Sequence, residues 1–134
     1  MSKHEKLTEQ EFGIQYVQPY RNPHRIYNNT GWIVWRKGTG LNTELLHIRT
    51  FEPGNGHGRL LFYDMLDMVE ATGGTYHSVY GFTNSDNTEA QAFYSALGFG
   101  LYRIPNVYKT GTAILFSQKI SRLKQCRKKY EEAQ

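Results

Sequence analysis

The sequence predicts an α/β (α+β) fold in which a mixed, mostly antiparallel twisted sheet is flanked by helices. Three observations support this prediction. Several short segments are rich in β-branched and aromatic residues, two longer segments carry apolar residues at helical spacing, and glycine or proline separates most of them. A chain of 134 residues usually forms one domain around one core, so we expect residues 1–134 to be a single domain.

The N-terminal part of the sequence has the weakest pattern. Apolar residues between Leu7 and Val17 fit a short helix or a strand, and Pro19 and Pro23 interrupt regular structure after them. We therefore expect residues 1–30 to form a poorly defined N-terminal arm.

Two strands should follow this arm. Residues 32–36 and 44–51 are rich in β-branched and aromatic side chains, and a Lys-Gly-Thr-Gly turn at residues 37–40 lies between them. Short connections of this kind join neighbouring strands, so we expect the two strands to pair antiparallel.

The first clear helical pattern begins after residue 58. Acidic side chains at Asp64, Asp67 and Glu70 fall on one face, and Gly73 with Gly74 ends the run. The opposite face is apolar and should pack against the sheet. It consists of Leu61, Phe62, Met65, Leu66 and Val69.

A second helix is predicted by its ends. Asp86 and Glu89 have capping-box spacing, and the helix that they open should run to Leu97. Gly98 then stands where a left-handed cap is favoured, and Phe99 is placed to pack back on the helix. By residue type, a strand over residues 76–82 should precede this helix, and strands over residues 100–104 and 108–118 should follow it.

The net charge of +4 comes from the C-terminal end of the chain. We expect residues 119–134 to form a basic helix or tail that is mainly solvated. A nucleic-acid partner stays open as a less favoured alternative, because a basic segment attracts polyphosphate. The basic residues are Lys119, Arg122, Lys124, Arg127, Lys128 and Lys129, against Glu131 and Glu132.

Composition limits the classes of protein that fit. The sequence has no apolar run long enough to cross a membrane, and its first residues are polar, which predicts a cytoplasmic protein without a membrane partner. Cys126 is the only cysteine, so neither an intramolecular disulfide nor a thiolate metal cluster can form. We predict no metal site.

The most informative segment is the glycine-rich loop at residues 53–59, Pro-Gly-Asn-Gly-His-Gly-Arg. Glycines let backbone amides approach an anion, and a following helix adds unpaired amides and a positive dipole. The spacing differs from the G-x-G-x-x-G of dinucleotide-binding folds, and the loop lacks the Gly-Lys-Ser/Thr ending of nucleotide-binding P-loops. A pyrophosphate-bearing cofactor of another kind is therefore expected.

Two segments in the expected order resemble the GNAT superfamily of acetyl-coenzyme A-dependent N-acetyltransferases. The first is the family's Arg/Gln-x-x-Gly-x-Gly/Ala loop, matched by Gly56 and Gly58 and their neighbours, with Pro53 in place of the opening Arg or Gln. The second is the family's Asn-x-x-Ala-x-x-hydrophobic-Tyr-x-x-x-Gly-Phe segment, matched at residues 87–99. The resemblance covers about residues 43–100 and implies a GNAT-like acyltransferase fold with a shortened N-terminal region.

The resemblance also implies how acetyl-CoA is bound. Backbone amides of the loop and the first helical turn would hold the pyrophosphate, and the strand before the loop would bind the pantetheine arm and polarise the thioester. Asn87 would either touch the coenzyme or cap its helix, and Tyr94 would lie beside the coenzyme sulfur. The implied cofactor-binding residues are Ile48, Arg49, Thr50, Gly54, Asn55, Gly56, His57, Gly58, Arg59, Leu60, Asn87 and Tyr94.

The implied reaction is attack of a primary amine on the thioester, which needs a base and an acid. Tyr94 occupies the position of the family's general acid, and Glu44 lies where related enzymes place a base. His47 has a more suitable pKa but opposite strand parity, so it faces away from the cleft unless a bulge re-aims it. We expect His57 to be exposed.

The acceptor amine is not specified by the sequence. The short N-terminal region favours an open cleft and an acceptor on a protein or another macromolecule, with aromatic residues such as Tyr16, Tyr20 and Trp32 available to line it. Two alternatives remain open: a nucleic-acid-binding or nucleic-acid-modifying protein on the same fold, and a non-catalytic acyl-CoA-binding protein. A monomer and a homodimer fit equally well.

Overall fold

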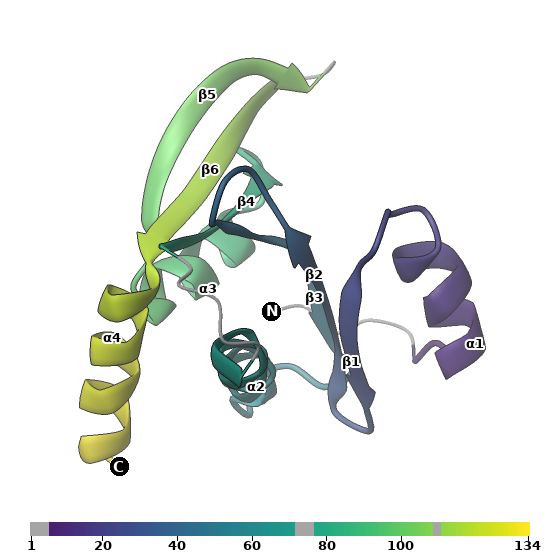
Figure 1. Cartoon of the computed structure of the whole chain (residues 1–134), viewed down its shortest axis with the longest axis horizontal. Helices are drawn as coiled ribbons and strands as arrows, with labels where there is room; N and C mark the ends of the chain where they lie inside the picture. The colour runs from purple at the N-terminus through teal and green to yellow at the C-terminus, as the bar shows by residue number, and fades with distance from the viewer. Residues whose placement is uncertain (1–5, 72–76, 109–110) are drawn as a thin grey trace. The chain divides into compact units, whose positions relative to one another are not determined.

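Figure 1 shows a computed structural model of the chain, which describes residues 6–71, 77–108 and 111–134 and, for residues 106–108, only the backbone. The chain divides into two compact units, residues 1–76 and residues 77–134. Each unit combines helices with strands, and the strand pairs within each unit are antiparallel. The predicted α/β class with mostly antiparallel strands and flanking helices is confirmed.

The strands of the first unit lie in the order β1, β2, β3. Strands β2 (Gly31–Lys37) and β3 (Thr43–Thr50) are the two predicted strands, and they pair antiparallel as expected. Strand β1 (His24–Asn28) pairs antiparallel with β2 and was not predicted, because it follows Pro23 in the segment expected to be irregular.

The N-terminal segment of this unit is helical and packs on the strands. A helical turn α1 (Glu9–Phe12) continues into a π-helical turn η1 (Gly13–Val17). Thr8 and Glu11 form a capping box at its start. Phe12 is fully buried in a cluster with Trp32 and Val34 of β2 and with Phe51. Residues 7–17 thus supply part of the core rather than a loose arm.

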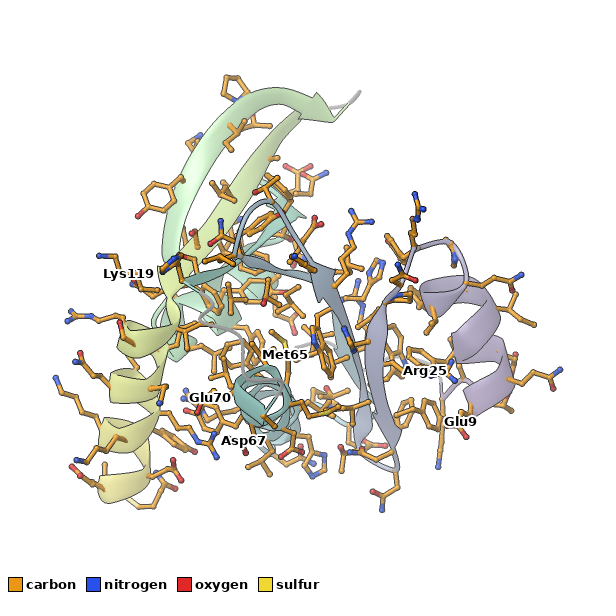
Figure 2. All side chains as sticks on the ribbon, in the orientation of Figure 1. Glu9, Arg25, Met65, Asp67, Glu70 and Lys119 are labelled. Atoms are coloured by element: carbon orange, nitrogen blue, oxygen red, sulfur yellow. The ribbon has the colours of Figure 1, made fainter. Side chains whose placement is uncertain are left out.

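Helix α2 (His57–Ala71) has the predicted apolar face, and all five predicted apolar positions are buried. Figure 2 shows Met65 on the side of α2 toward the strands and Asp67 on the side away from them. Val69 and Trp35 line one small pocket, whereas Trp32 and Val34 belong to the Phe12 cluster. Helix α2 and the N-terminal helical segment therefore cover opposite faces of β2. The predicted helix end at Gly73 and Gly74 lies outside the described residues.

The strands of the second unit lie in the order β4, β6, β5. Strand β4 (Ser78–Asn84) matches the predicted strand, although Tyr76 of that prediction lies outside the described residues. Strands β5 (Gly100–Tyr108) and β6 (Gly111–Lys119) form the long antiparallel hairpin visible in Figure 1.

Helix α3 (Thr88–Leu97) confirms the second predicted helix. The Asn87 side chain accepts a hydrogen bond from the Ala90 amide at 3.0 Å, so Asn87 takes the capping role that was one of its two predicted roles, and the helix does not begin with the Asp86–Glu89 capping box. At the other end Gly98 has a φ of 108°, and the Phe99 amide donates to the Tyr94 carbonyl at 3.1 Å. This is the predicted left-handed cap.

Helix α4 (Ile120–Glu132) forms the C-terminal segment. Ile120 and Leu123 are buried, and most of its lysine and arginine side chains are exposed. In the part of the chain that the structure describes, every helix is too short or too polar to span a membrane.

Candidate active site

The glycine-rich loop has the backbone that anion binding requires. Gly54 and Gly56 have φ values of 83° and 79°, in the region that side chains disfavour. An added Cβ at either position would meet nothing within 4 Å, and both residues are exposed. The backbone at these two glycines therefore faces open space that a ligand can enter.

Helix α2 begins inside the loop at His57, one residue before the last glycine of the loop, Gly58. Its first internal bond runs from the Leu60 amide to the Gly56 carbonyl at 3.2 Å, so the Leu60 amide is already used. The amides of His57 and Gly58 come before that bond and have no carbonyl four residues back in the helix. The first turn of α2 thus offers donors and a positive dipole to an anion.

His57 differs from the prediction that it would be exposed. Its side chain is half-buried, and Nδ1 is fully buried without a hydrogen-bond partner among the described residues. A buried polar atom without a partner is costly. Within this loop, it fits a site at which an acceptor such as a phosphate oxygen completes the hydrogen bond.

Three other loop residues, Arg59, Asn55 and Pro53, differ in how they are held. The Arg59 guanidinium donates to the Tyr63 hydroxyl at 2.7 Å and lies over the same ring, which fixes the arginine along α2. Asn55, between the two left-handed glycines, is exposed. Pro53 is also exposed and supplies no backbone donor.

The end of β3 leads into the loop and holds the other predicted cofactor residues. Ile48 and Thr50 are buried, and Arg49 between them is half-buried. The Arg49 guanidinium donates to the Ile48 carbonyl at 2.7 Å, so this side chain folds back on its own strand.

A bulge in β3 changes which side chains share a face. Val34 pairs with His47, but the next residue of β2, Trp35, pairs with Leu45, so Leu46 is the extra residue. Beyond this bulge the alternation of side chains is shifted by one position. Glu44 and His47 therefore lie on the same face of β3, which is the exception that the sequence left open for His47.

Glu44, the predicted base, is held in an ion pair. Its Oε1 accepts from Arg36 Nε at 2.9 Å, and the two residues are direct partners across β2 and β3. The Glu44 side chain is 15% exposed. The Glu44 carboxylate is therefore already paired with the Arg36 guanidinium in the absence of substrate.

His47 is surrounded by aromatic side chains. Its Nε2 lies 2.7 Å from the Tyr20 hydroxyl, and the Tyr16 ring packs edge-on against it with centroids 5.1 Å apart. Burial, helped by the positive charge of Arg49, lowers the pKa of His47 from its usual 6.5 to about 4. His47 is therefore neutral at physiological pH, with one ring nitrogen able to accept a proton.

Tyr94, the predicted acid, belongs to the second unit and lies in an aromatic stack. It is 7% exposed, and its ring stacks on Phe116 at a centroid distance of 3.7 Å. Phe99 packs edge-on against both rings. Asn87 lies two helical turns before Tyr94 on α3, is exposed, and uses its side-chain oxygen to cap the helix.

Two further observations complete the account of the predicted site residues. Trp32 and Trp35 are both buried, on opposite faces of β2, and of the two Trp35 lines the small pocket beside Val69. Among the residues that the structure describes, no three histidine, cysteine or carboxylate side chains gather as metal ligands would.

Comparison with known proteins gives a result only at the level of structure, since no family model and no curated protein matches the chain. An acetyltransferase of the GNAT family from Bacillus cereus is 20% identical, with a TM-score of 0.55 over 67% of this chain and 62% of that one. The ribosomal-protein-S18-alanine N-acetyltransferase from Escherichia coli is 20% identical, with a TM-score of 0.61 over 85% and 77%. The chain has the GNAT acetyltransferase fold.

A third solved structure contains acetyl coenzyme A, the cofactor that the family resemblance implies. A protein assigned as a streptothricin acetyltransferase from Bacillus anthracis was solved in complex with acetyl coenzyme A. It is 19% identical, with a TM-score of 0.65 over 79% of this chain and 66% of that one. The chain spans about three fifths of the length of several such proteins, 62% for the Bacillus cereus enzyme.

Proposed function

We propose that the protein is an N-acetyltransferase that moves the acetyl group of acetyl-CoA to a primary amine. One observation carries the proposal: the open, left-handed backbone at Gly54 and Gly56 directly before α2, in a chain with the GNAT fold. This backbone can present several amides to one pyrophosphate, as a coenzyme A site requires. The complex of the Bacillus anthracis protein supports acetyl-CoA as the acyl donor.

The residues of the first unit would share the binding of acetyl-CoA. The amides of the loop and of His57 and Gly58 would hold the pyrophosphate, and the buried His57 Nδ1 would gain a partner there. The backbone of Ile48, Arg49 and Thr50 would bind the pantetheine arm and the acetyl carbonyl. When bound, acetyl-CoA supplies the activated acetyl group, and the protein supplies orientation and proton transfer.

In the proposed reaction a neutral amine attacks the thioester carbonyl, and the C–S bond breaks as the new C–N bond forms. The leaving thiolate takes a proton, for which we propose the Tyr94 hydroxyl as the donor. The amine must lose a proton, and β3 offers Glu44 and His47 as acceptors on one face. Once the nitrogen has lost a proton, it could leave only as an amine anion. The thiolate is the far better leaving group, so the C–S bond breaks and the amide product remains.

For the acceptor, we propose an amine on a protein. The Escherichia coli neighbour, whose name describes acetylation of an alanine of ribosomal protein S18, supports this choice. A small polyamine is the alternative acceptor. The peptides of the test below distinguish a protein N-terminus from a lysine side chain, because mass spectrometry shows which amine of a peptide carries the acetyl group.

The proposal is tested by incubating the protein with acetyl-CoA and a panel of peptides and polyamines, followed by mass spectrometry. We expect one or more amines to gain an acetyl group. Tyr94→Phe should lower kcat by roughly 10²-fold and leave acetyl-CoA affinity unchanged, because a general acid acts only in the chemical step. Tyr102→Phe, at an exposed tyrosine on β5, is the matched control and should retain full activity.

Two outcomes of this test would contradict different parts of the proposal. Acetyl-CoA binding without transfer to any amine would contradict the enzymatic proposal and favour a non-catalytic acyl-CoA-binding protein. Unchanged turnover in Tyr94→Phe would remove Tyr94 as the acid and leave the rest of the proposal intact.

A further inference from the structure

Four polar or ionisable side chains of the first unit form one connected group, which we call the β3 polar cluster: Tyr20, Arg36, Glu44 and His47. Arg36 Nε contacts Glu44 Oε1 at 2.9 Å, and the Arg36 guanidinium lies over the Tyr20 ring at 5.4 Å. The Tyr20 hydroxyl lies 2.7 Å from His47 Nε2. Two of its members, Glu44 and His47, lie on β3 just before Ile48 to Thr50. The proposed function assigns the backbone of those three residues to the pantetheine arm and the acetyl carbonyl.

Glu44 and His47 have different tasks in this cluster. Glu44 neutralises and orients Arg36, and Arg36 in turn holds the Tyr20 ring by a cation–π contact. Among the residues that the structure describes, His47 has no carboxylate partner: its Nε2 meets the Tyr20 hydroxyl, its ring packs against Tyr16 and Tyr20, and Arg49 is the charge that acts on it. Glu44 therefore acts as a structural counter-ion, whereas His47 keeps a lone pair for proton transfer.

The direction of the bond between Tyr20 and His47 follows from their acidities. An imidazole nitrogen is a much stronger base than a neutral phenol oxygen, so the favoured arrangement has Tyr20 O–H donating to His47 Nε2. His47 then carries its own proton on Nδ1. The Tyr20 oxygen keeps its lone pairs and can accept a hydrogen bond from an amine N–H.

We propose that Tyr20 and His47 form a two-step proton relay that deprotonates the acceptor amine, and that Glu44 is not the base. The proposal rests on the proposed N-acetyltransferase function. As the amine nitrogen bonds to the acetyl carbon, its N–H bond breaks and a new Tyr20 O–H bond forms. The original Tyr20 proton passes to His47 Nε2, and the resulting imidazolium later releases a proton to water.

The electrostatic surroundings of His47 keep it unprotonated at rest and also weaken it as a base, since a general base works best with a pKa near the operating pH. Burial and the nearby Arg49 lower its pKa to about 4, so the imidazole is unprotonated in the resting protein. For the same reasons the imidazolium formed in the relay would lose its proton readily. The relay would thus return to its starting state after each transfer.

The kinetic test compares four variants in the acetyl-transfer assay. Tyr20→Phe keeps the ring but removes the relaying hydroxyl, and His47→Gln removes the imidazole. Each should lower kcat by roughly 10²- to 10⁴-fold with acetyl-CoA affinity unchanged. Glu44→Gln should stay within about tenfold of the parent protein, because it weakens only the positioning of Arg36. Tyr102→Phe, at an exposed tyrosine of β5 that takes no part in the cluster, should retain activity and is the control.

Opposite results would overturn the relay. A loss of 10²-fold or more in Glu44→Gln, with His47→Gln within threefold of the parent, would make Glu44 the base. Full activity in Tyr20→Phe would exclude the relay while leaving the acetyltransferase proposal in place. Absence of transfer by the parent protein would instead contradict the proposed function itself.

A second measurement needs no activity. Nitrogen-15 NMR of the imidazole at pH 7 should show a neutral His47 with its proton on Nδ1 and a hydrogen-bonded, unprotonated Nε2. In Tyr20→Phe the Nε2 resonance should shift, because its donor is gone. A proton on Nε2 in the parent protein would mean that His47 donates to Tyr20, which would overturn the relay.

Discussion

Two tyrosines, Tyr94 and Tyr20, carry the proposed proton transfers in very different surroundings. Tyr94 lies in a stack of buried rings with Phe99 and Phe116, where packing dominates. Tyr20 lies in the β3 polar cluster, where its hydroxyl meets a ring nitrogen and its face meets a guanidinium. We therefore expect the aromatic stack to contribute more to the stability of its unit than the polar cluster contributes to the stability of the first unit.

The largest effect on stability should come from breaking the aromatic stack. Phe116 is 1% exposed, so Phe116→Ala should cost about 3–5 kcal/mol of unfolding free energy through lost burial and a cavity. Tyr20→Phe should cost only about 0.5–1.5 kcal/mol, the net value of one hydrogen bond. Urea unfolding of both variants measures these losses of unfolding free energy. Equal losses would contradict the expectation that the aromatic stack contributes more stability than the polar cluster.

A smaller effect is expected where α3 ends. Gly98 has a φ of 108°, and an added Cβ would lie 2.6 Å from Cys126 Sγ. Gly98→Ala should therefore cost about 2–4 kcal/mol, from the left-handed backbone and the overlap together. The double variant Gly98→Ala with Cys126→Ala should recover part of the loss. If thermal unfolding showed no recovery of stability in the double variant, overlap with Cys126 of α4 would not contribute to the loss caused by Gly98→Ala.

The smallest effect concerns the pH dependence of the polar cluster. The folded pKa of His47 is about 4 and its usual value is 6.5, so the unfolded chain binds the proton first as the pH falls. Stability from this group is present above pH 6.5 and is lost toward pH 4. Because His47 is only half-buried, the loss between pH 7.5 and pH 5 should be about 1 kcal/mol.

The control for this prediction is His47→Gln, which does not titrate. The difference in unfolding free energy between the parent protein and His47→Gln should shrink on going from pH 7.5 to pH 5. A constant difference would mean that the pKa of His47 is not lowered in the folded state. Chemical denaturation at both pH values provides the measurement.

Features governed by nearby residues were predicted well from the sequence. The apolar face of α2 follows from helical spacing, and the cap at Gly98 follows from the glycine and Phe99 beside it. The left-handed glycines of the loop follow from residue type. The sequence offered both Asp86 and Asn87 as caps of α3, and the chain uses Asn87.

Features that depend on distant residues were missed. Strand β1 exists because it pairs with β2, although its own sequence follows a proline. The bulge at Leu46 appears only when β3 is set against β2, and it places His47 on the same face as Glu44, the exception that the prediction for His47 allowed. The contact of His47 with Tyr20 joins residues 27 positions apart, and no local pattern reports it.

The same limit applies to the ion pair of Glu44. Arg36 and Glu44 each look like ordinary strand residues in the sequence, and their pairing follows from the register of β2 and β3. The position of Glu44 in the motif predicts a base, and the ion pair with Arg36 is a feature that this position does not reveal. The assignment of the base stays a prediction for the kinetic variants to decide.

The most direct test of the central claim is calorimetric titration with acetyl-CoA of the parent protein, Gly56→Ala and Gly40→Ala. Gly40 has a φ of 59° and is as open as Gly56, so both substitutions impose similar backbone strain. The parent should bind with a Kd of roughly 1 μM to 1 mM, Gly40→Ala should match it, and Gly56→Ala should bind at least about tenfold more weakly. No binding by the parent, or equal binding by all three proteins, would contradict the assignment of the glycine loop as the coenzyme A site.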